Sequence, residues 1–365
     1  MQLRPVTPPA DVRIGFIGSG FARRVQLPGL AFVPGAKATA IASGHRSNAE
    51  AVAREFGLAH VFTDGTELAR SPHVDLVVVS STPDSHARYA IAALEAGKHV
   101  LCEKPMAIDG FEASQMVAAS EQHPDSLAWV DHELRYEPNR RRARELIRSN
   151  AIGALWHIEL SLKPYLRGDG RPQALDAPWN WWSDAARGGG ILGAVGSHLI
   201  DLCRFWSGSE ISYVAGLAES FVKQRNDERG ELRPVTADDF ASCVLQTATG
   251  AVATITLSTV AHHGPGHLGQ VTGSEGTLLL SGETRLELGK SSGGGPLEDI
   301  SAPDDLWEQT KPNNMWARSF VRLMREMIHV IRGGTPQGEP ATFRDGWQVQ
   351  RVLDAIRGGR GVQLD

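Results

Sequence analysis

The sequence predicts two units: an α/β Rossmann domain with a parallel, doubly wound sheet, then an α+β domain with a large, mostly antiparallel open sheet. An apolar, β-branched run at 12–17 leads into the glycine turn Gly18-Ser19-Gly20, the strand–turn–helix order of a dinucleotide-binding unit. Strand-like and helix-like segments then alternate up to residue 130, which is typical of parallel sheets with right-handed crossovers. After residue 150, strand-like segments follow one another with few helices between them, which favours an antiparallel or mixed sheet.

In the first half, short apolar runs alternate with turns and helix-like segments. The expected strands are 12–17, 38–42, 74–80, 98–102 and 127–130. The expected helices begin at Phe21 and cover 47–56, 84–96 and 110–122. Residues 1–133 are therefore predicted to form the nucleotide-binding domain.

The second half, residues 134–365, begins with a basic helix over 139–149. We interpret its run RRRAREL as a solvated face, because Glu137 and Glu145 balance the short basic cluster. The expected strands are 155–162, 211–219, 241–246, 251–258 and 276–281, and two amphipathic helices are expected over 316–332 and 345–357.

The composition excludes several classes of protein. The 365 residues carry 37 basic and 42 acidic side chains, interleaved, for a net charge of −5, so no polybasic nucleic-acid surface is expected. No apolar run is long enough to span a bilayer, and the first residues lack the apolar core of a secretion signal. Cys102, Cys203 and Cys243 are scattered without metal-ligand spacing. We expect a cytoplasmic enzyme with no metal, nucleic-acid partner or membrane attachment.

Ligands of parallel sheets bind at the carboxyl ends of the strands. Four segments follow strand ends here: Gly18-Ser19-Gly20, Ser43-Gly44-His45-Arg46, Ser81-Thr82-Pro83 and Glu103-Lys104-Pro105. Backbone N–H groups of the glycine turn, and of Phe21 and Ala22 where the helix begins, predict a pyrophosphate site. Arg23 departs from the small residue that the fingerprint has at its third position. We expect all four segments to line a nicotinamide dinucleotide.

The second strand end bears on the choice between NAD and NADP. A site for NAD places Asp or Glu there to bind the ribose 2′-hydroxyl, whereas this chain has Ser43, Gly44, His45 and Arg46. A hydroxyl and a guanidinium suit a 2′-phosphate, which favours NADP. The alternative is that Arg46 is merely solvated and that NAD is accepted.

Lys104 is the candidate for proton transfer. Pro105 has a fixed φ and no N–H, so the backbone after the lysine is stiff and could hold the ammonium in place. Hydride transfer to or from a carbon that bears oxygen requires the oxygen to lose or gain a proton, and we expect Lys104 to exchange it. Free lysine titrates near ~10.4; burial and a nicotinamide cation would lower that value, and a facing Glu103 carboxylate would oppose the change.

Two neighbouring segments of the second half carry further candidates. Trp179, Trp181 and Trp182 either pack between the domains or form a pocket wall, where an indole such as that of Trp182 stacks on a sugar or on the nicotinamide. The glycines at 188–190 then begin a helix on which Ala194, His198 and Asp201 share a face. A helical histidine is usually a core residue. The glycines, which imply a close approach of backbone or ligand, and the acid one turn away favour a site role for His198, such as proton relay.

The chain resembles the glucose–fructose oxidoreductase, inositol dehydrogenase and MocA family nearly end to end. The resemblance is carried by VRIGFIGSGFARR, SSTPDSHARYAIAALEAGKHVLCEKPM, DHELRYEP, GGGILGAVGSHLID and TGSEGTLLL. It implies an N-terminal Rossmann domain and a C-terminal α+β domain that binds substrate. It also implies oxidation or reduction of sugars, polyols and related molecules with NAD(P), and a homodimer or homotetramer formed through the open sheet.

The resemblance also implies roles for individual residues. Lys104 matches the lysine near the nicotinamide and the substrate hydroxyl, His198 the relay or substrate-binding histidine, and Asp201 the acid after it; His86 joins Ser81-Thr82-Pro83 along the cofactor. The peptide before Pro105 is often cis in the family. The expected substrate contacts are Lys104, Tyr136, Tyr165, Trp182 and His198.

One departure concerns Ala194, because many polyol dehydrogenases of this family carry Asp four residues before the histidine. Alanine can neither accept a proton nor hold the imidazole. The candidates to replace the acid are left open at this point: Tyr136, His132, Tyr165 and Asp201.

The expected activity is that of an NAD(P)-dependent dehydrogenase or reductase acting on a CH–OH group of a sugar, glycoside, polyol or related small molecule. One alternative is an enzyme that keeps its nicotinamide bound and cycles it within one turnover, as an oxidoreductase or as an NAD-dependent glycosidase. Another is a non-catalytic protein that senses NAD(P). The presence of both Lys104 and His198 argues against the sensor, which needs no proton relay.

Overall fold

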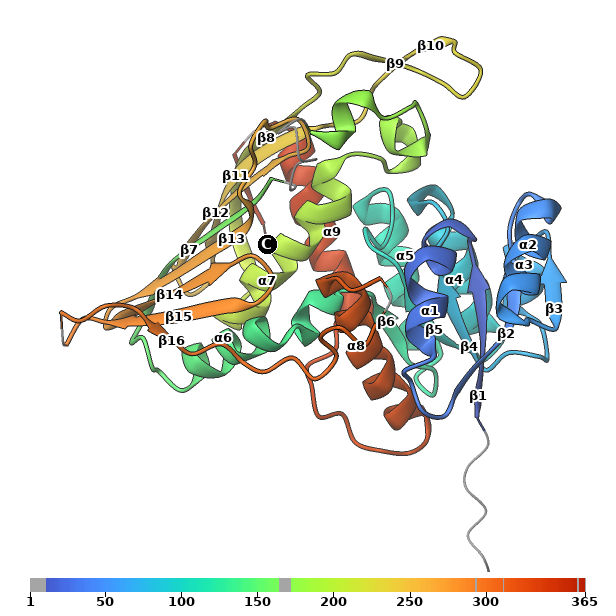
Figure 1. Ribbon diagram of the computed structural model, residues 1–365, viewed down its shortest axis with the longest axis horizontal. Helices are drawn as coiled ribbons and strands as arrows, with labels where there is room; N and C mark the ends of the chain where they lie inside the picture. The colour runs from blue at the N-terminus through green and yellow to red at the C-terminus, as the bar shows by residue number, and fades with distance from the viewer. Residues whose placement is uncertain (1–10, 164–171, 293, 311, 360, 365) are drawn as a thin grey trace, which may run out of the picture.

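The computed structural model describes residues 11–163, 172–292, 294–310, 312–359 and 361–364. Within these ranges the chain forms a six-strand parallel sheet and a nine-strand open sheet. Figure 1 shows the open sheet at the left, the parallel sheet at the right, and helices α7, α8 and α9 between them. The predicted combination of an α/β and an α+β domain is therefore confirmed.

The parallel sheet has the strand order β3-β2-β1-β4-β5-β6. Its strands are β1 (Val12–Ile17), β2 (Ala36–Ala42), β3 (His60–Phe62), β4 (Leu76–Val79), β5 (His99–Cys102) and β6 (Ala128–Val130). The order changes direction between β1 and β4, and open α/β sheets bind ligands beyond the carboxyl ends of the strands at such a point. The architecture therefore directs attention to the segments that follow β1, β2, β4 and β5.

Two hydrophobic cores lie on the two faces of this sheet, because successive residues of a strand point to opposite sides. Phe16 and Val78 pack in one core, and their chain neighbours Ile17 and Val79 pack in the other. The covering helices are α1 (Leu27–Leu30), which follows a π-helical turn (Ala22–Gln26), α2 (Arg46–Phe56), α3 (Gly65–Ala69), α4 (His86–Glu95) and α5 (Gly110–Gln122). The sequence does not predict β3 or α3, because each is too short to show a period.

Helix α8 (Met315–Ile331) comes late in the chain but packs on the parallel sheet. Phe320, Val321 and Met324 join the same core as Ile14 and Phe16. Its apolar period predicts the helix, but burial of its apolar face against a distant part of the chain decides where it lies. The predicted division after residue 133 follows the end of β6, and α8 adds a piece of the second half to the first domain.

The open sheet has the order β16-β15-β14-β13-β7-β12-β11-β8-β17. Its strands are β7 (Leu155–Lys163), β8 (Ile211–Glu219), β11 (Phe240–Thr247), β12 (Val252–Ser258), β13 (Gly266–Gly273), β14 (Gly276–Ser281), β15 (Arg285–Lys290), β16 (Glu298–Asp299) and β17 (Val362–Gln363). β7 pairs parallel with β12, and the other pairs are antiparallel. β9 (Gln224–Asn226) and β10 (Leu232–Pro234) form a separate hairpin. The sequence does not predict β13 or β15.

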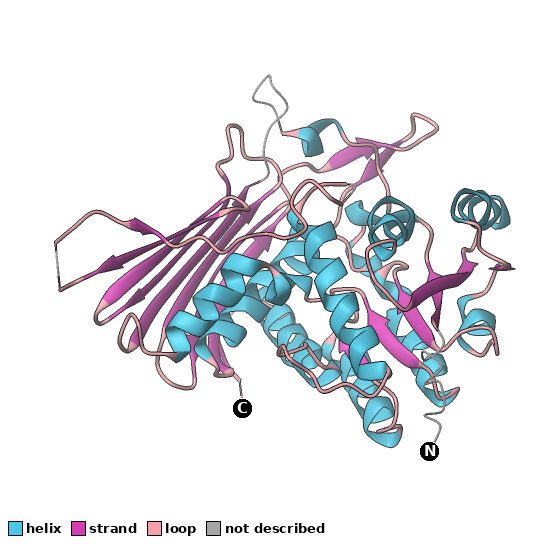
Figure 2. Ribbon diagram, turned by 60° about the horizontal axis from the view of Figure 1, so that its bottom comes forward, coloured by secondary structure: helices cyan, strands magenta, loops and turns pink. Residues whose placement is uncertain are grey.

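Within the described residues, helices cover one face of the open sheet (Figure 2). These helices are α6 (Pro138–Arg148), α7 (Ser197–Ser207) and α9 (Phe343–Arg357), and their side chains share a core with the sheet. On the other face Leu217, Val244 and Leu268 are between 38% and 48% exposed. The described helices include none that is long and apolar enough to cross a membrane.

Candidate active site

The glycine turn brings the carboxyl ends of three strands together. The N–H of Gly18 donates to the carbonyl of Ala42 at the end of β2, at 2.9 Å. Gly18 has φ +105°, and a Cβ there would collide with the carbonyl oxygen of Ser80, which follows β4. Ser19 Oγ lies 3.3 Å from Ser43 Oγ. In contrast, no atom beyond its chain neighbours and its own helix backbone lies within 4 Å of where a Cβ would sit on Gly20. The turn thus needs its first glycine for the fold, and its second borders open space.

Substitution by alanine should separate these two roles. We expect Gly18→Ala to destabilise the protein by more than about 1 kcal/mol, because alanine is strained at positive φ and clashes with the backbone after β4. Gly20→Ala should leave the unfolding midpoint close to that of the wild type but weaken dinucleotide binding at least tenfold. Thermal unfolding and titration with reduced nicotinamide measure the two effects. Unchanged binding by folded Gly20→Ala would remove the pyrophosphate from this turn.

At the end of β2, Arg46 begins helix α2 and is exposed. Its Nη1 lies 3.3 Å from Glu50 Oε1, and the two side chains are 68% and 42% exposed. Such a surface pair contributes little to stability, so the guanidinium can exchange Glu50 for another anion. Gly44 borders open space in the same way as Gly20.

His86, the first residue of α4, connects the segments that follow β4 and β5. Its ring nitrogens lie 3.0 Å from the carbonyl oxygen of Pro105 and 3.1 Å from that of Ser81. Burial lowers the pKa of His86, and a neutral imidazole has one N–H to donate to one of these carbonyls. Because His86 is 1% exposed, it holds the two backbone segments in place and does not face an open ligand site.

Lys104 follows β5, and the peptide bond between Lys104 and Pro105 is cis. Its Nζ donates to the carbonyl oxygen of Ala194 at 3.2 Å and lies 3.8 Å from Glu103 Oε2. The rings of Phe21 and Trp316 have their centroids 5.9 and 6.0 Å from this nitrogen. The ammonium therefore reaches from the parallel sheet to the helical turn that precedes α7, and its side chain is 16% exposed.

His198, on α7, lies behind this contact and is completely buried. Its ring centroid is 5.1 Å from that of Trp316, the indole that also borders Lys104, and 5.5 Å from that of His132. Burial, reinforced by the charge of Lys104, holds the pKa of His198 well below its usual value. The imidazole is therefore neutral at neutral pH, and neither of its nitrogens has a hydrogen-bond partner.

The glycines before α7 allow the two domains to approach closely, as the sequence predicts. A Cβ on Gly193 would lie 3.3 Å from Pro105 Cγ, and one on Gly188 would overlap Pro83. Arg187 adds polar contacts, with Nη2 3.3 Å from Thr82 Oγ1 and Nε 3.4 Å from Asp84 Oδ2. The segments after β4 and β5 thus meet the second domain along residues 187–194.

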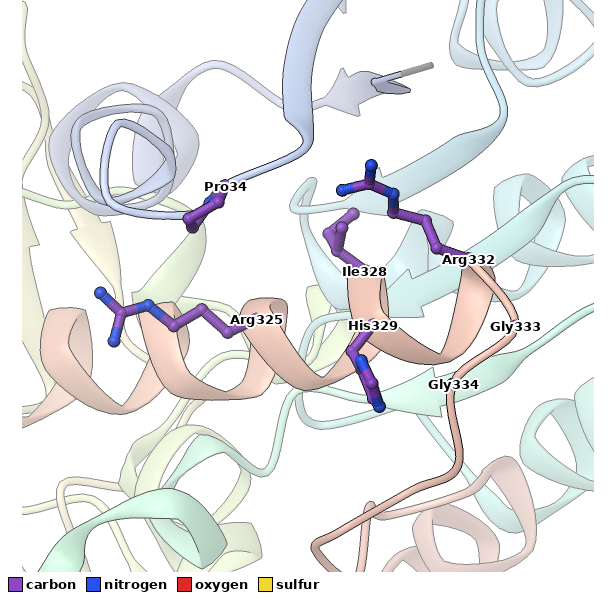
Figure 3. A pocket seen from close by; sticks show the side chains of 7 residues that line it. All are labelled: Pro34, Arg325, Ile328, His329, Arg332, Gly333 and Gly334. Carbon is purple, nitrogen blue, oxygen red and sulfur yellow. The ribbon is translucent and has the colours of Figure 1, made fainter. Parts of the chain in front are cut away.

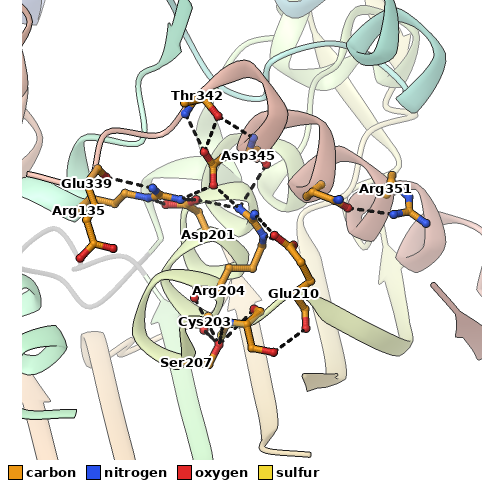
Figure 4. A network of polar contacts seen from close by, with 12 residues as sticks. Arg135, Asp201, Cys203, Arg204, Ser207, Glu210, Glu339, Thr342, Asp345 and Arg351 are labelled. Atoms are coloured by element: carbon orange, nitrogen blue, oxygen red, sulfur yellow. Dashed lines mark hydrogen bonds and ion pairs between the residues drawn. The ribbon is translucent and has the colours of Figure 1, made fainter. Parts of the chain in front are cut away.

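Asp201 is engaged in a buried ion pair with two arginines. Arg135 donates to both of its oxygens, Nε to Oδ2 at 2.7 Å and Nη2 to Oδ1 at 2.6 Å. Arg135 and Arg204 also contact Asp345, which closes a buried network (Figure 4). Burial acts to raise the pKa of Asp201, but the charge and hydrogen bonds of Arg135 more than offset it and the pKa is lowered. These contacts favour a structural role for Asp201 in place of the expected catalytic one.

The other sequence-predicted candidates differ in position. Tyr136 is buried in the core shared by α8 and the parallel sheet, and its hydroxyl has no partner; burial, with the charge of Glu326, raises its pKa. This placement does not support the expected contact between Tyr136 and substrate. Trp182 is 37% exposed, with its ring 5.7 Å from that of Trp181. His132 is buried beside His198. Tyr165 lies outside the described residues.

Four residues that the sequence analysis does not single out border the same region. Gln26 Nε2 donates to Glu103 Oε1 at 2.9 Å, and its Oε1 accepts from Ser80 Oγ. Asp131 and Glu133 follow β6 and are buried, and the Trp316 ring borders both Lys104 and His198. The sequence does contain a signal for Asp131 and Glu133 as site residues. They follow the predicted strand 127–130, just as the four candidate segments follow other strands of the sheet. Among the described residues, no group of three metal-ligating side chains is arranged to hold a metal ion.

A surface pocket of about 590 Å³ lies elsewhere, at the C-terminal end of α8 (Figure 3). Arg325, His329 and Arg332 project from this helix, and Pro34 faces them from the loop that enters β2. Because this loop is at the amino end of a parallel strand, the pocket is on the opposite edge from the nucleotide segments. None of the sequence-predicted site residues lines it.

Two family models match most of the chain. The one described as the oxidoreductase family with an NAD-binding Rossmann fold covers residues 12–132, and the GFO/IDH/MocA C-terminal domain covers residues 140–279. Among similar sequences, glucose-fructose oxidoreductase domain-containing protein 2 of Xenopus laevis is 31% identical, over 94% of this chain and 90% of that protein. An uncharacterized oxidoreductase of Synechocystis sp. is 29% identical, over 96% of this chain and 95% of that protein.

Solved structures have the same fold. An oxidoreductase domain protein from Kribbella flavida superposes with a TM-score of 0.84 at 26% identity, over 98% of this chain and 100% of that one. Levoglucosan dehydrogenase in complex with NADH and levoglucosan superposes with a TM-score of 0.82 at 23% identity, over 97% of this chain and 99% of that one. At that identity the second likeness establishes the fold alone.

Proposed function

Because the chain belongs to the GFO/IDH/MocA oxidoreductase family, we propose that it transfers hydride between a nicotinamide dinucleotide and a hydroxyl- or carbonyl-bearing carbon of a sugar, glycoside or polyol. One observation carries the proposal. The Lys104 ammonium, at the carboxyl end of β5, touches the helical turn of the second domain at Ala194. This contact is on the edge of the sheet where the glycine turn follows β1, and ligands bind at that edge in open α/β sheets.

The residues at this edge fit a dinucleotide. Gly20 and Gly44 border open space where phosphate and ribose can approach the backbone, and Ser19 and Ser43 offer hydroxyls between them. When bound, the nicotinamide accepts or supplies the hydride. The chain's own contribution is to orient the reactants and to move a proton. Lys104 Nζ would take the proton of the substrate hydroxyl in oxidation and return it to the carbonyl oxygen in reduction.

The substrate class rests on the second domain and on the relatives. Trp182, partly exposed, and Arg187, which contacts Thr82, lie on the segment that meets the strand ends; an indole and a guanidinium are suited to the face and hydroxyls of a sugar ring. Levoglucosan dehydrogenase, a structural neighbour, was solved with levoglucosan. We therefore propose a carbohydrate or cyclitol substrate.

A screen of sugars, glycosides and polyols with NAD⁺ and NADP⁺ tests the proposed activity, with reduced-nicotinamide absorbance as the readout. Turnover of at least one carbohydrate supports it. Nicotinamide that copurifies and does not exchange, with activity only when a donor and an acceptor sugar are both present, would instead indicate internal redox cycling. Binding of nicotinamide without turnover on the whole panel would indicate a sensor and would contradict the proposed activity.

NADP is the proposed cofactor, because the end of β2 carries Ser43 and Arg46 and no carboxylate. We expect Arg46→Ala to weaken NADPH binding about tenfold or more, since a charge-assisted contact to the 2′-phosphate is lost, and to leave NADH binding nearly unchanged. Arg70→Ala is the matched control, because Arg70 is 62% exposed, close to the 68% of Arg46, and is likewise paired with an acid, Glu95. Equal weakening of NADPH and NADH by Arg46→Ala would exclude the phosphate contact.

We further propose that the uncovered face of the open sheet joins copies of this chain into a dimer or tetramer. Its half-exposed side chains, Leu217, Val244 and Leu268, form apolar surface that a second copy could bury. The three cysteines are free and buried, which supports a reducing compartment such as the cytoplasm.

A further inference from the structure

Behind Lys104 lies a cluster of buried carboxyl groups, which we call the acid cluster: Glu103 after β5, and Asp131 and Glu133 after β6. These residues are 6%, 1% and 1% exposed. Three acids in one buried region are unusual, because burial of a carboxylate without a partner is strongly unfavourable. The region therefore needs either cations to pair with the acids or protons to neutralise them.

Two other buried acids near this region, Glu137 and Asp201, are paired with arginine. Glu137 accepts from Arg140 Nη1 at 2.7 Å, and Asp201 accepts from Arg135 through both oxygens. The acid cluster differs in this respect. The positive charge that acts on all three of its members is that of Lys104. One ammonium cannot balance three buried carboxylates, so the cluster must retain protons at neutral pH.

Within the cluster, Glu133 is the member placed to exchange a proton. Both oxygens of Glu103 are engaged, by Gln26 Nε2 at 2.9 Å and by the backbone N–H of Lys104 at 3.2 Å. Asp131 Oδ2 accepts from Gln26 Nε2 at 3.4 Å, and its other oxygen has no partner. Glu133 Oε2 has no hydrogen-bond partner either, but it lies 3.6 Å from His198 Nε2, which also has none. Unpartnered buried polar atoms on both sides of a short gap call for a functional explanation.

Burial raises the pKa of Glu133 to about 8; the Lys104 charge lowers it and the Glu103 charge raises it. Since the folded value lies above the usual one, the carboxyl group is protonated below about pH 8 and ionised above it. The other titratable groups of the region are Asp131 and His132 on the same segment, and His198 on α7. Arg140 and His267, on α6 and β13, act on His198.

We propose that Glu133 exchanges a proton with Lys104, and that His198, which faces Glu133 and borders the same Trp316 ring as Lys104, relays it. The inference rests on the proposed function. A bound nicotinamide would supply the hydride in reduction. Lys104 Nζ would give its proton to the carbonyl oxygen, and Glu133 would return a proton to the amine by way of His198. A proton from solvent would then restore Glu133. In oxidation each proton moves in the opposite direction. Glu133 acts through Lys104 and is a positioning residue.

Infrared titration tests the proton on Glu133 without any substrate. The difference spectrum between wild type and Glu133→Gln should contain the band of a protonated carboxylic acid at pH 7, lost with a midpoint near pH 8. In the Lys104→Met background the midpoint should rise by about one unit or more, because the ammonium that stabilises the carboxylate is absent. A band already missing at pH 7, or a midpoint that does not respond to Lys104→Met, would overturn the inference, whatever the substrate screen finds.

Turnover supplies the second readout. In the wild type, the rate of reduction should fall above about pH 8 and the rate of oxidation should rise. Glu133→Asp should keep this change of rate with pH. Glu133→Gln should lose it and turn over at least tenfold more slowly. Cofactor binding should stay within threefold of wild type in both variants. If Glu133→Gln does not fold, infrared titrations of the wild type and of Glu133→Asp, each with and without Lys104→Met, decide the question. The measured quantity is the shift of the carboxylic-acid midpoint that Lys104→Met causes. A pH break that persists in folded Glu133→Gln would contradict the exchange. Failure of the proposed function is distinguished by the absence of turnover in wild type.

Discussion

Replacement of Lys104 by methionine is expected to lower kcat/KM by about 10²- to 10⁴-fold, the range that general acid–base catalysis supplies. Methionine has a similar length and can border the Phe21 and Trp316 rings, so the contact surface is retained while the proton-carrying nitrogen and its bond to the Ala194 carbonyl are lost. Because no contact of Lys104 with the glycine turn is needed to hold the pyrophosphate, dinucleotide binding should change little. Steady-state rates and fluorescence titration with reduced nicotinamide measure the two quantities.

Lys98→Met is the matched control, since Lys98 precedes β5 at its amino end and Lys104 follows it at its carboxyl end. Its turnover should equal that of the wild type. If Lys104→Met binds cofactor and turns over normally, the proton is carried by another group and the acid–base assignment is wrong. If it neither binds nor folds, the lysine is a structural residue of this edge.

Replacement of Arg135 by methionine is expected to destabilise the protein by about 3–5 kcal/mol, the cost of removing one partner from a buried ion pair. Arg135 is 7% exposed and donates to both oxygens of Asp201, and it also lies 3.2 Å from Asp345 Oδ1. Without the guanidinium, Asp201 is a buried carboxylate supported on one side by Arg204. The midpoint of urea-induced unfolding, with Arg344→Met as control, measures the loss.

Arg344 pairs with Glu121 at 2.6 Å on the surface, where the two side chains are 65% and 58% exposed. Removal of Arg344 should therefore cost less than about 1 kcal/mol of folding stability.

The contribution of the buried network to folding stability depends on pH with a definite sign. The pKa of Asp201 and of Asp345 is lowered in the folded protein, so their contribution is present above the usual value of 3.8 and is lost as the pH falls through the folded value. The stability gap between wild type and Arg135→Met should therefore narrow on acidification. Equal losses from Arg135→Met and Arg344→Met would mean that the buried network is not stabilising.

Several features could be predicted because they depend on residues close together in the chain. The apolar runs that became β1, β4 and β5, the turn at Gly18, and the proline after Lys104 are local signals, and each was found at the expected strand end. The short elements β3 and α3 and the strands β13 and β15 were missed, because their patterns are too short or too polar to stand out from loops. Pairing with neighbouring strands stabilises β3, β13 and β15, and burial of Leu68 and Ala69 stabilises α3.

The site residues also divide into those that the sequence pattern could predict and those that depend on contacts between distant segments. Lys104 and the segment around Ala194 do meet, because glycines at 188 and 193 allow Pro83 and Pro105 to approach. Asp201 shares a helix face with His198 in the sequence pattern, but helical spacing does not reveal that Arg135 binds both of its oxygens. Glu133 went unnoticed because its importance depends on what it lacks, a hydrogen-bond partner in a buried place.

The amino-acid sequence by itself determined the two-domain α/β and α+β architecture, the family, and the lysine at the end of β5, since hydrophobic period, turn chemistry and strand-end position are properties of short segments. Only the tertiary structure decided which buried acid faces His198, which acid is neutralised by arginine, and where α8 packs. Those outcomes depend on burial and on charges brought together from distant parts of the chain, and the free energy of a buried charge is set by its neighbours in space.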